Sequence, residues 1–170
     1  EKTANKIYDE MTDFAKYAFN KSHAAAYAVV SYQTAWLKYY YPVEYMAALM
    51  TSVIDNPGKV AEYIYSCRQM GIKILPPDIN HGYSSFSVDN GSIRYGLAAI
   101  KSIGRPVIKE IVAERKANGE FKNLKDFIER MSGKDINKRT IENFIKSGAF
   151  DELGGTRKQF MVIYVQILDQ

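Results

Sequence analysis

The sequence predicts a mainly α-helical fold, in which a helical first part is joined by a short β-hairpin to a second helical part. Three observations support this class. Apolar residues recur at helical spacing through most of residues 2–70. The polar–apolar alternation that is typical of strands is confined to the surroundings of Asp89-Asn90-Gly91. Glycine-containing turns between short helical patterns follow in the rest of the chain.

The first part of the chain is predicted to hold four helices with short links. Proline and glycine mark their limits: Pro42 ends the second helix and begins the third, and Gly71 stops the fourth. Asn56-Pro57-Gly58 is a break between the third and fourth helices. We expect the helices over residues 2–18, 22–41, 43–53 and 59–70.

The second of these helices is apolar almost all round, which predicts neighbours on every side, either in this chain or in a further part of a longer protein. It carries five tyrosines: Tyr27, Tyr32, Tyr39, Tyr40 and Tyr41. Tyrosines in such a pattern can stack on nucleic-acid bases. We interpret them instead as core or interface residues whose hydroxyl groups reach water.

The start of the same helix combines Asn20, Lys21, Ser22 and His23, followed by three alanines. Free backbone N–H groups and the positive end of the helix dipole suit an anion at such a point, above all a phosphate. The alternative is ordinary helix structure, with Asn20 or Ser22 as the N-cap and the alanines at a helix–helix contact. The residue types alone leave both interpretations open.

Residues 72–77 switch to extended sequence because proline excludes helix at its own position and at the one before. The strands around Asp89-Asn90-Gly91 complete a hinge-like joint. We therefore expect a helical subdomain over 1–75, an extended linker with a β-hairpin over 76–96, and a second helical subdomain over 97–170.

Residues 97–104 and the helix expected over 107–116 form a short helix, a tight turn and a second helix, the pattern of a helix-hairpin-helix. Such a turn exposes backbone N–H groups that can hold one DNA phosphate without reading bases. The expected contact residues are Lys101, Ser102, Ile103, Gly104, Arg105 and Lys109.

A second hairpin is predicted over 140–150, and Ile145-Lys146-Ser147-Gly148 weakly repeats the phrase that begins at Ile100. An amphipathic helix, with apolar residues from Phe121 to Met131, connects the two hairpins. The last helix is expected from about Thr156, with Arg157 and Lys158 in its first turn. Cations are unfavourable there unless an anion is near, so we expect either a phosphate or simple solvation of both side chains.

Composition limits the function classes. The 170 residues have a net charge of +4, too modest for a histone-like binder, so any nucleic-acid site must be a local patch. The single Cys67 excludes an internal disulfide, and no apolar run is long enough to span a membrane. We expect a cytoplasmic protein, and the start at Glu1 suggests a piece of a longer chain.

Four stretches together resemble one family: FNKSHAAAYAVVSYQTAWLKYYYPVEYMAALMT, KILPPDIN, IRYGLAAIKSIG and NKRTIENFIKSGAFDELGGTRKQF. They are similar, in order, to the fingers and helix-hairpin-helix regions of the alpha subunits of bacterial DNA polymerase III, the class C replicative polymerases. The resemblance implies that residues 1–75 belong to a helical fingers subdomain and residues 97–170 to a tandem helix-hairpin-helix subdomain.

The family's function supplies further expectations. The resemblance implies DNA-directed DNA synthesis by a longer protein, with Mg²⁺ held by carboxylates of a palm domain that this sequence does not contain. No catalytic, metal or cofactor residue is therefore expected in these residues, which by themselves should be inactive. The implied partners are duplex primer-template DNA, a deoxynucleoside triphosphate and other polymerase III holoenzyme subunits, with no membrane.

Carried over residue by residue, Lys21, His23 and Tyr27 become candidates for nucleotide binding, while Lys101 to Arg105 would lie at the duplex backbone. Ser102 stands where the wider hairpin pattern has one of its two glycines, and the second hairpin, with Ala149 and Phe150 after Gly148, departs further. A helix-hairpin-helix module of another replication or repair protein, and a scaffold for other subunits, are the alternatives.

Overall fold

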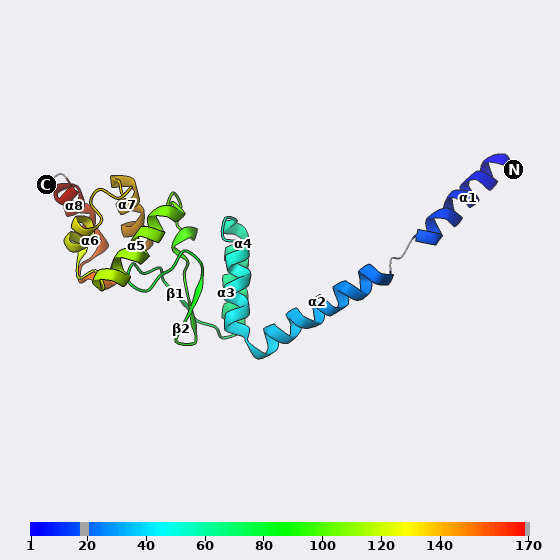
Figure 1. The fold of residues 1–170 in the computed structure, drawn as a ribbon, viewed down its shortest axis with the longest axis horizontal. Coiled ribbons are helices and arrows are strands. Elements are labelled where there is room, and N and C mark those ends of the chain that lie inside the picture. The colour runs from blue at the N-terminus through cyan, green and yellow to red at the C-terminus, as the bar shows by residue number, and fades with distance from the viewer. Residues whose placement is uncertain (18–20, 169–170) are drawn as a thin grey trace. The chain divides into compact units, whose positions relative to one another are not determined.

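The computed structural model describes residues 1–17 and 21–168, and it divides into two units, residues 1–42 and 43–170 (Figure 1). The first unit consists of helices α1 (Lys2–Tyr17) and α2 (Lys21–Tyr40). Both were predicted, with ends within one residue of those observed. Ser22 lies inside α2 and is not its N-cap, whereas Asn20, the other candidate, falls outside the described residues.

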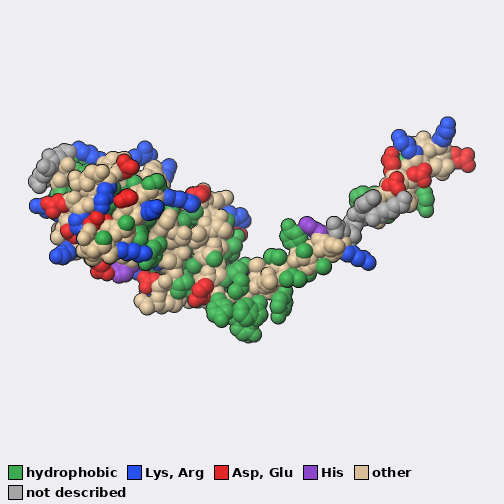
Figure 2. Space-filling view, viewed as in Figure 1, with side chains coloured by type: hydrophobic (Ala, Val, Ile, Leu, Met, Phe, Trp, Pro, Cys, Tyr) green, Lys and Arg blue, Asp and Glu red, His purple; other side chains and the backbone are tan. Residues whose placement is uncertain are grey.

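Helix α2 buries none of its residues, and Figure 2 shows hydrophobic side chains exposed along it. Tyr27 is 60% exposed, Trp36 42% and Tyr39 78%. The sequence left two options for the neighbours of this helix, this chain or a further part of a longer protein, and both stay predictions. Local ring contacts on this helix include that between Trp36 and Tyr40, whose ring centroids lie 4.8 Å apart.

In the second unit, α3 (Pro42–Ser52) and α4 (Pro57–Gln69) pack against a small sheet. Asn56 caps α4 by accepting a hydrogen bond from the Lys59 N–H at 3.1 Å, so that helix begins two residues earlier than expected. The predicted face of α4 is confirmed, because Val60 and Cys67 are buried and Ile64 is partly buried.

The sheet has three strands in the order β1-β3-β2, namely β1 (Ile74–Leu75), β2 (Ser87–Asp89) and β3 (Ser92–Arg94). The β2–β3 hairpin was predicted, and β1 adds to β3 in parallel. Ile72, Phe86 and Ile93 share one core with α3 and α4. The extended segment therefore packs into the second unit, and the boundary between the two compact units lies at Pro42.

The remaining elements surround a second core. They are the 3₁₀ turn η1 (Leu97–Ala99), α5 (Arg105–Asn118), α6 (Leu124–Arg130), α7 (Lys138–Ser147), the 3₁₀ turn η2 (Asp151–Leu153) and α8 (Arg157–Leu168). Four phenylalanines pack edge to face at its centre, a geometry that aromatic rings favour; they are Phe121, Phe127, Phe144 and Phe150.

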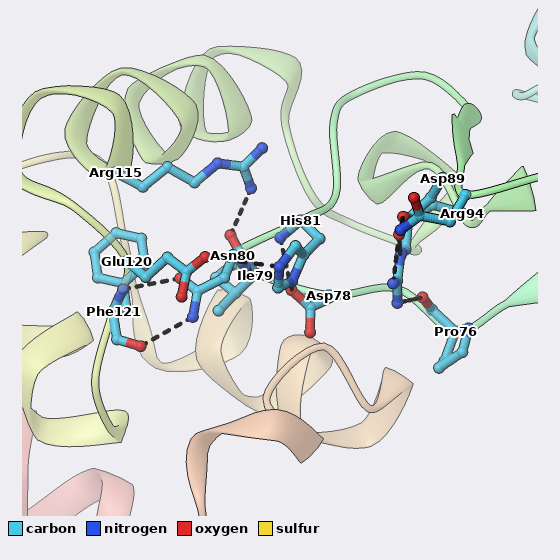
Figure 3. Close-up of polar contacts among 11 residues, drawn as sticks. Pro76, Asp78, Ile79, Asn80, His81, Asp89, Arg94, Arg115, Glu120 and Phe121 are labelled. Atoms are coloured by element: carbon cyan, nitrogen blue, oxygen red, sulfur yellow. Dashed lines mark hydrogen bonds and ion pairs between the residues drawn. The ribbon is translucent and has the colours of Figure 1, made fainter.

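The segment 78–81 crosses this second core and is held from three sides (Figure 3). The Ile79 N–H donates to the Ala149 carbonyl at 2.9 Å, and the Ile79 carbonyl accepts from Arg115 at 2.7 Å. Asn80 bonds to both the N–H and the carbonyl of Phe121, at 2.8 and 2.9 Å. These bonds join the extended segment to α5, to the loop before α6 and to the second hairpin.

Glu114 on α5 binds two cations that follow later in the chain, Arg130 and Lys134. Its carboxylate accepts from Arg130 of α6 at 3.1 Å and from Lys134 at 2.6 Å, and from Asn118 on its own helix at 2.8 Å. These hydrogen bonds, that from Lys134 above all, lower the pKa of Glu114 from 4.5 to about 2. The cluster ties α5 to the far end of α6.

This geometry makes a pH-dependent prediction for Glu114→Gln. A carboxylate whose pKa is lower in the folded state stabilises the fold above its unfolded pKa and loses that contribution as pH falls through the folded value. We expect a lower melting temperature than wild type at pH 7, with the difference shrinking from about pH 4.5 and gone near pH 2. Thermal unfolding over a pH series measures it. Glu110→Gln on the same helix is the control, and an equal loss in both variants would contradict the role of Glu114.

Candidate nucleic-acid interface

The first hairpin turn places Ser102, Gly104 and Arg105 at the start of a long helix. Ser102 has a φ of 64°, the left-handed region that glycine adopts most easily. This conformation explains why the wider motif has glycine there. Gly104 is the N-cap of α5 in extended conformation and supplies no side-chain cap. The N–H groups of Arg105 and Val107 in the first turn of α5 consequently have no intrahelical acceptor, while Pro106 between them has no N–H.

Two contacts fix the turn in place. Ile103 is 8% exposed and anchors it in the second core. Asn143 of α7 donates from Nδ2 to the Lys101 carbonyl at 3.0 Å. The sequence analysis missed Asn143, because nothing local marks a residue 42 positions away as a partner of the turn. The turn is thus held by the buried side chain of Ile103 and by the side-chain amide of Asn143 on α7.

The cations that the sequence predicted around the turn are exposed. Lys101 lies on the turn, while Arg105 and Lys109 follow one helical turn apart on α5. Arg105 makes an ion pair with Asp55, Nη2 to Oδ2, at 3.2 Å. Because both side chains are well exposed, such a pair is worth about 0–1 kcal/mol, and an incoming phosphate can displace it at small cost.

The second hairpin shares with the first a left-handed residue two positions before a helix N-cap, whereas the N-caps differ, since Gly104 is extended with ψ 141° and Phe150 has ψ 6°. Gly148, with φ 87°, occupies the left-handed position of Ser102, and Phe150 precedes η2 as Gly104 precedes α5. The two turns therefore align Ser102 with Gly148. The repeat in the sequence aligns Lys101 with Lys146, and it differs by one residue from this correspondence of the left-handed positions.

At the second hairpin a carboxylate occupies the helix start. Asp151 is the first residue of η2 and makes two hydrogen bonds with Arg157, at 2.8 and 2.5 Å. Arg157 also donates to the Lys146 carbonyl at 3.2 Å, and its pKa is raised by the hydrogen bond to Asp151. The anion expected beside Arg157 is thus supplied by the protein.

Glycine is required at position 148 for two reasons. Its φ is positive, and a Cβ there would lie 2.8 Å from the Asp151 carboxylate and within the space of the Arg157 guanidinium. The ion pair therefore packs directly on the turn, where the N–H groups of Gly148, Ala149 and Asp151 already donate to backbone carbonyls.

Helix α8 begins with a capping box that the sequence analysis did not identify. The Thr156 N–H donates to Gln159 Oε1 at 2.9 Å, while the Gln159 N–H donates to Thr156 Oγ1 at 3.3 Å. Lys158, in the first turn, is exposed and has no ion-pair partner among the described residues. Of the two cations predicted there, Lys158 alone is without a carboxylate partner in the described part of the chain.

The three candidates at the start of α2 are brought together only in part. The rings of His23 and Tyr27, one turn apart, lie 4.4 Å apart between centroids. Lys21 is the first residue of α2 and, at about 100° per residue, projects some 160° around the helix from His23. All three side chains are exposed.

Among residues 1–17 and 21–168, no three His, Cys, Asp or Glu side chains converge in a way that could hold a metal ion. Within those ranges, every helix is too short or too polar to cross a lipid bilayer.

The turn between η1 and α5, repeated between α7 and η2, defines a class of protein. The sequence pattern of the helix-hairpin-helix motif family matches residues 71–160, more than half of the chain, and the chain belongs to this family. The match begins ahead of the two hairpins and includes β1 to β3, in agreement with their packing into the same unit.

Similarity to particular proteins extends to residues on both sides of that match. Over 159 residues the chain is 52% identical to DNA polymerase III subunit alpha of Vibrio cholerae and 51% identical to that of Escherichia coli K12. It is 49% identical over 154 residues to the same subunit of Deinococcus radiodurans. These alignments cover 91–93% of this chain and 12–14% of the relatives, so the chain spans about one seventh of their length.

Proposed function

We propose that this chain is a section of a bacterial replicative DNA polymerase and that it holds duplex primer-template DNA without reading its sequence. The observation that supports it is the coincidence of 52% identity to a polymerase subunit with an open hairpin turn at Lys101–Arg105. The catalytic palm with its Mg²⁺ belongs to the remainder of that polymerase, which acts in the cytoplasm with other holoenzyme subunits. Residues 1–170 alone do not extend a primer in this proposal.

The chemistry of the first hairpin suits a phosphate. Its helix start presents N–H groups and the positive end of the α5 dipole, both of which attract an anion. Lys101 and Arg105 add positive charge beside them. Contacts of N–H groups and cationic side chains with phosphate do not distinguish one base pair from another. The site therefore positions the DNA duplex without recognising its base sequence.

Fluorescence anisotropy with a labelled duplex, over a salt series, tests the proposal. We expect Lys101→Ala and Arg105→Ala each to weaken binding several-fold and to reduce the log–log salt slope by roughly 0.9, the value for one phosphate contact on B-DNA. Lys146→Ala, on the second hairpin, is the matched control and should leave both quantities unchanged. Wild-type binding that is absent at low salt would refute the duplex grip.

We further propose that the start of α2 contributes to the site for the incoming nucleotide. The support is the motif at 19–27 with the ring contact between His23 and Tyr27, and a cation at Lys21. A lysine at a helix start suits a triphosphate, and an aromatic pair suits a base or sugar. The exposed apolar remainder of α2 fits burial against other parts of a longer polymerase.

Steady-state kinetics of the full-length polymerase test this second proposal. Lys21→Ala or His23→Ala should raise KM for nucleotide or lower kcat, by about tenfold for the loss of one charge-assisted contact. The dissociation constant for primer-template should stay near the wild-type value. Lys38→Ala, in the last turn of the same helix, is the control. Unchanged kinetics in both variants would remove these residues from the nucleotide site.

A further inference from the structure

A groove runs beside the first hairpin, between α5 and the segment Tyr83–Ser85. It has a volume of about 290 Å³, and its α5 wall consists of Arg105, Ile108, Lys109 and Val112. Ile108 is buried and Val112 half-buried, so the floor is apolar, whereas the cations lie on the exposed rim. We call this feature the α5 groove.

The charges of α5 are segregated around its axis. Arg105, Lys109 and Lys116 fall within about 40° of one another at 3.6 residues per turn, whereas Glu110 and Glu114 lie on the opposite side. The contacts agree with this arrangement. Glu110 lines a separate hollow with Lys134, and Glu114 is bound to Arg130 and Lys134. The charged residues on the groove side of α5 are therefore all cations, one of which, Arg105, is paired with Asp55.

The opposite wall is held firmly. The Tyr83 ring has the guanidinium of Arg115 at 4.9 Å from its centroid and the Lys116 ammonium at 5.8 Å. Arg115 is fixed in turn by its bond to the Ile79 carbonyl. The Tyr83 and Ala98 region is further tied by backbone bonds, from Leu97 N–H to the Tyr83 carbonyl at 2.8 Å and from Ala98 N–H to the Ser84 carbonyl at 3.1 Å. The groove is thus a preformed surface.

We propose that the α5 groove carries the sugar–phosphate backbone of the DNA strand whose phosphate the first hairpin holds. This inference rests on the duplex grip proposed above. An apolar floor suits deoxyribose, and a rim of cations with the Ser84 and Ser85 hydroxyl groups suits phosphates. Arg105 and Lys116 are separated by eleven residues, or about 16 Å of helix, several times the ~3.4 Å axial spacing of phosphates on one strand. More than one phosphate is therefore within reach.

The test is duplex binding by Lys109→Ala/Lys116→Ala over a salt series, with melting temperature as the check of folding. Two lost contacts should lower the log–log salt slope by roughly 1.8 and weaken binding about tenfold or more at low salt. The control is Lys122→Ala/Lys125→Ala, which removes the same charge from the loop before α6 and from α6 itself. It should keep the wild-type slope.

Three outcomes overturn the inference, and they are distinguishable from one another. A wild-type slope for Lys109→Ala/Lys116→Ala together with a reduced slope for Lys101→Ala would remove the groove and leave the hairpin grip intact. No duplex binding by the wild-type chain would remove both. Competition by a short polyglutamate as effective as by DNA of equal charge would show an acidic protein segment to be the occupant.

Discussion

The hydrogen bonds of Ile79 and Asn80 are the constraint on which the rest of the second unit depends. Within two residues the chain bonds to α5 through Arg115, to the loop before α6 through Phe121, and to the second hairpin through Ala149. Each partner is a buried or partly buried polar group that would cost about 1–3 kcal/mol if left unpaired. The extended segment consequently connects these three elements, and the bond of Arg115 to the Ile79 carbonyl attaches α5 to it.

The two hairpins show how one backbone turn can serve two purposes. Both place a left-handed residue two positions before an N-cap, Ser102 in one and Gly148 in the other. In the first, the N-cap is Gly104 and the first helical residue is Arg105, so no carboxylate of these two residues occupies the helix start. In the second, Asp151 neutralises the helix start, and its ion pair with Arg157 covers the turn. In our proposal the first turn therefore binds a phosphate, and the second is a structural joint.

Local signals in the sequence predicted the elements well. Pro42, Gly71 and the Asp89-Asn90-Gly91 turn marked the ends of helices and the β-hairpin because each acts within a few residues. The parallel pairing of β1 with β3 and the bonds of Asn80 could not be predicted, since their partners lie 19 to 41 residues away and no periodicity reports them. The same holds for the candidate site. The local sequence predicted the turn at Lys101–Arg105, but it did not predict the contact of Asn143 or the Tyr83 wall of the groove.

Amide chemical shifts of the ¹⁵N-labelled chain, followed during titration with duplex DNA, test most directly the claim that the hairpins have different roles. We predict that the N–H signals of residues 101–105 and 107 move progressively with DNA, because a phosphate binds at that helix start; Pro106 has no N–H. Those of residues 148–153, beside the Arg157–Asp151 pair, should stay in place. Shifts of equal size at both turns, or shifts confined to the second, would contradict the account.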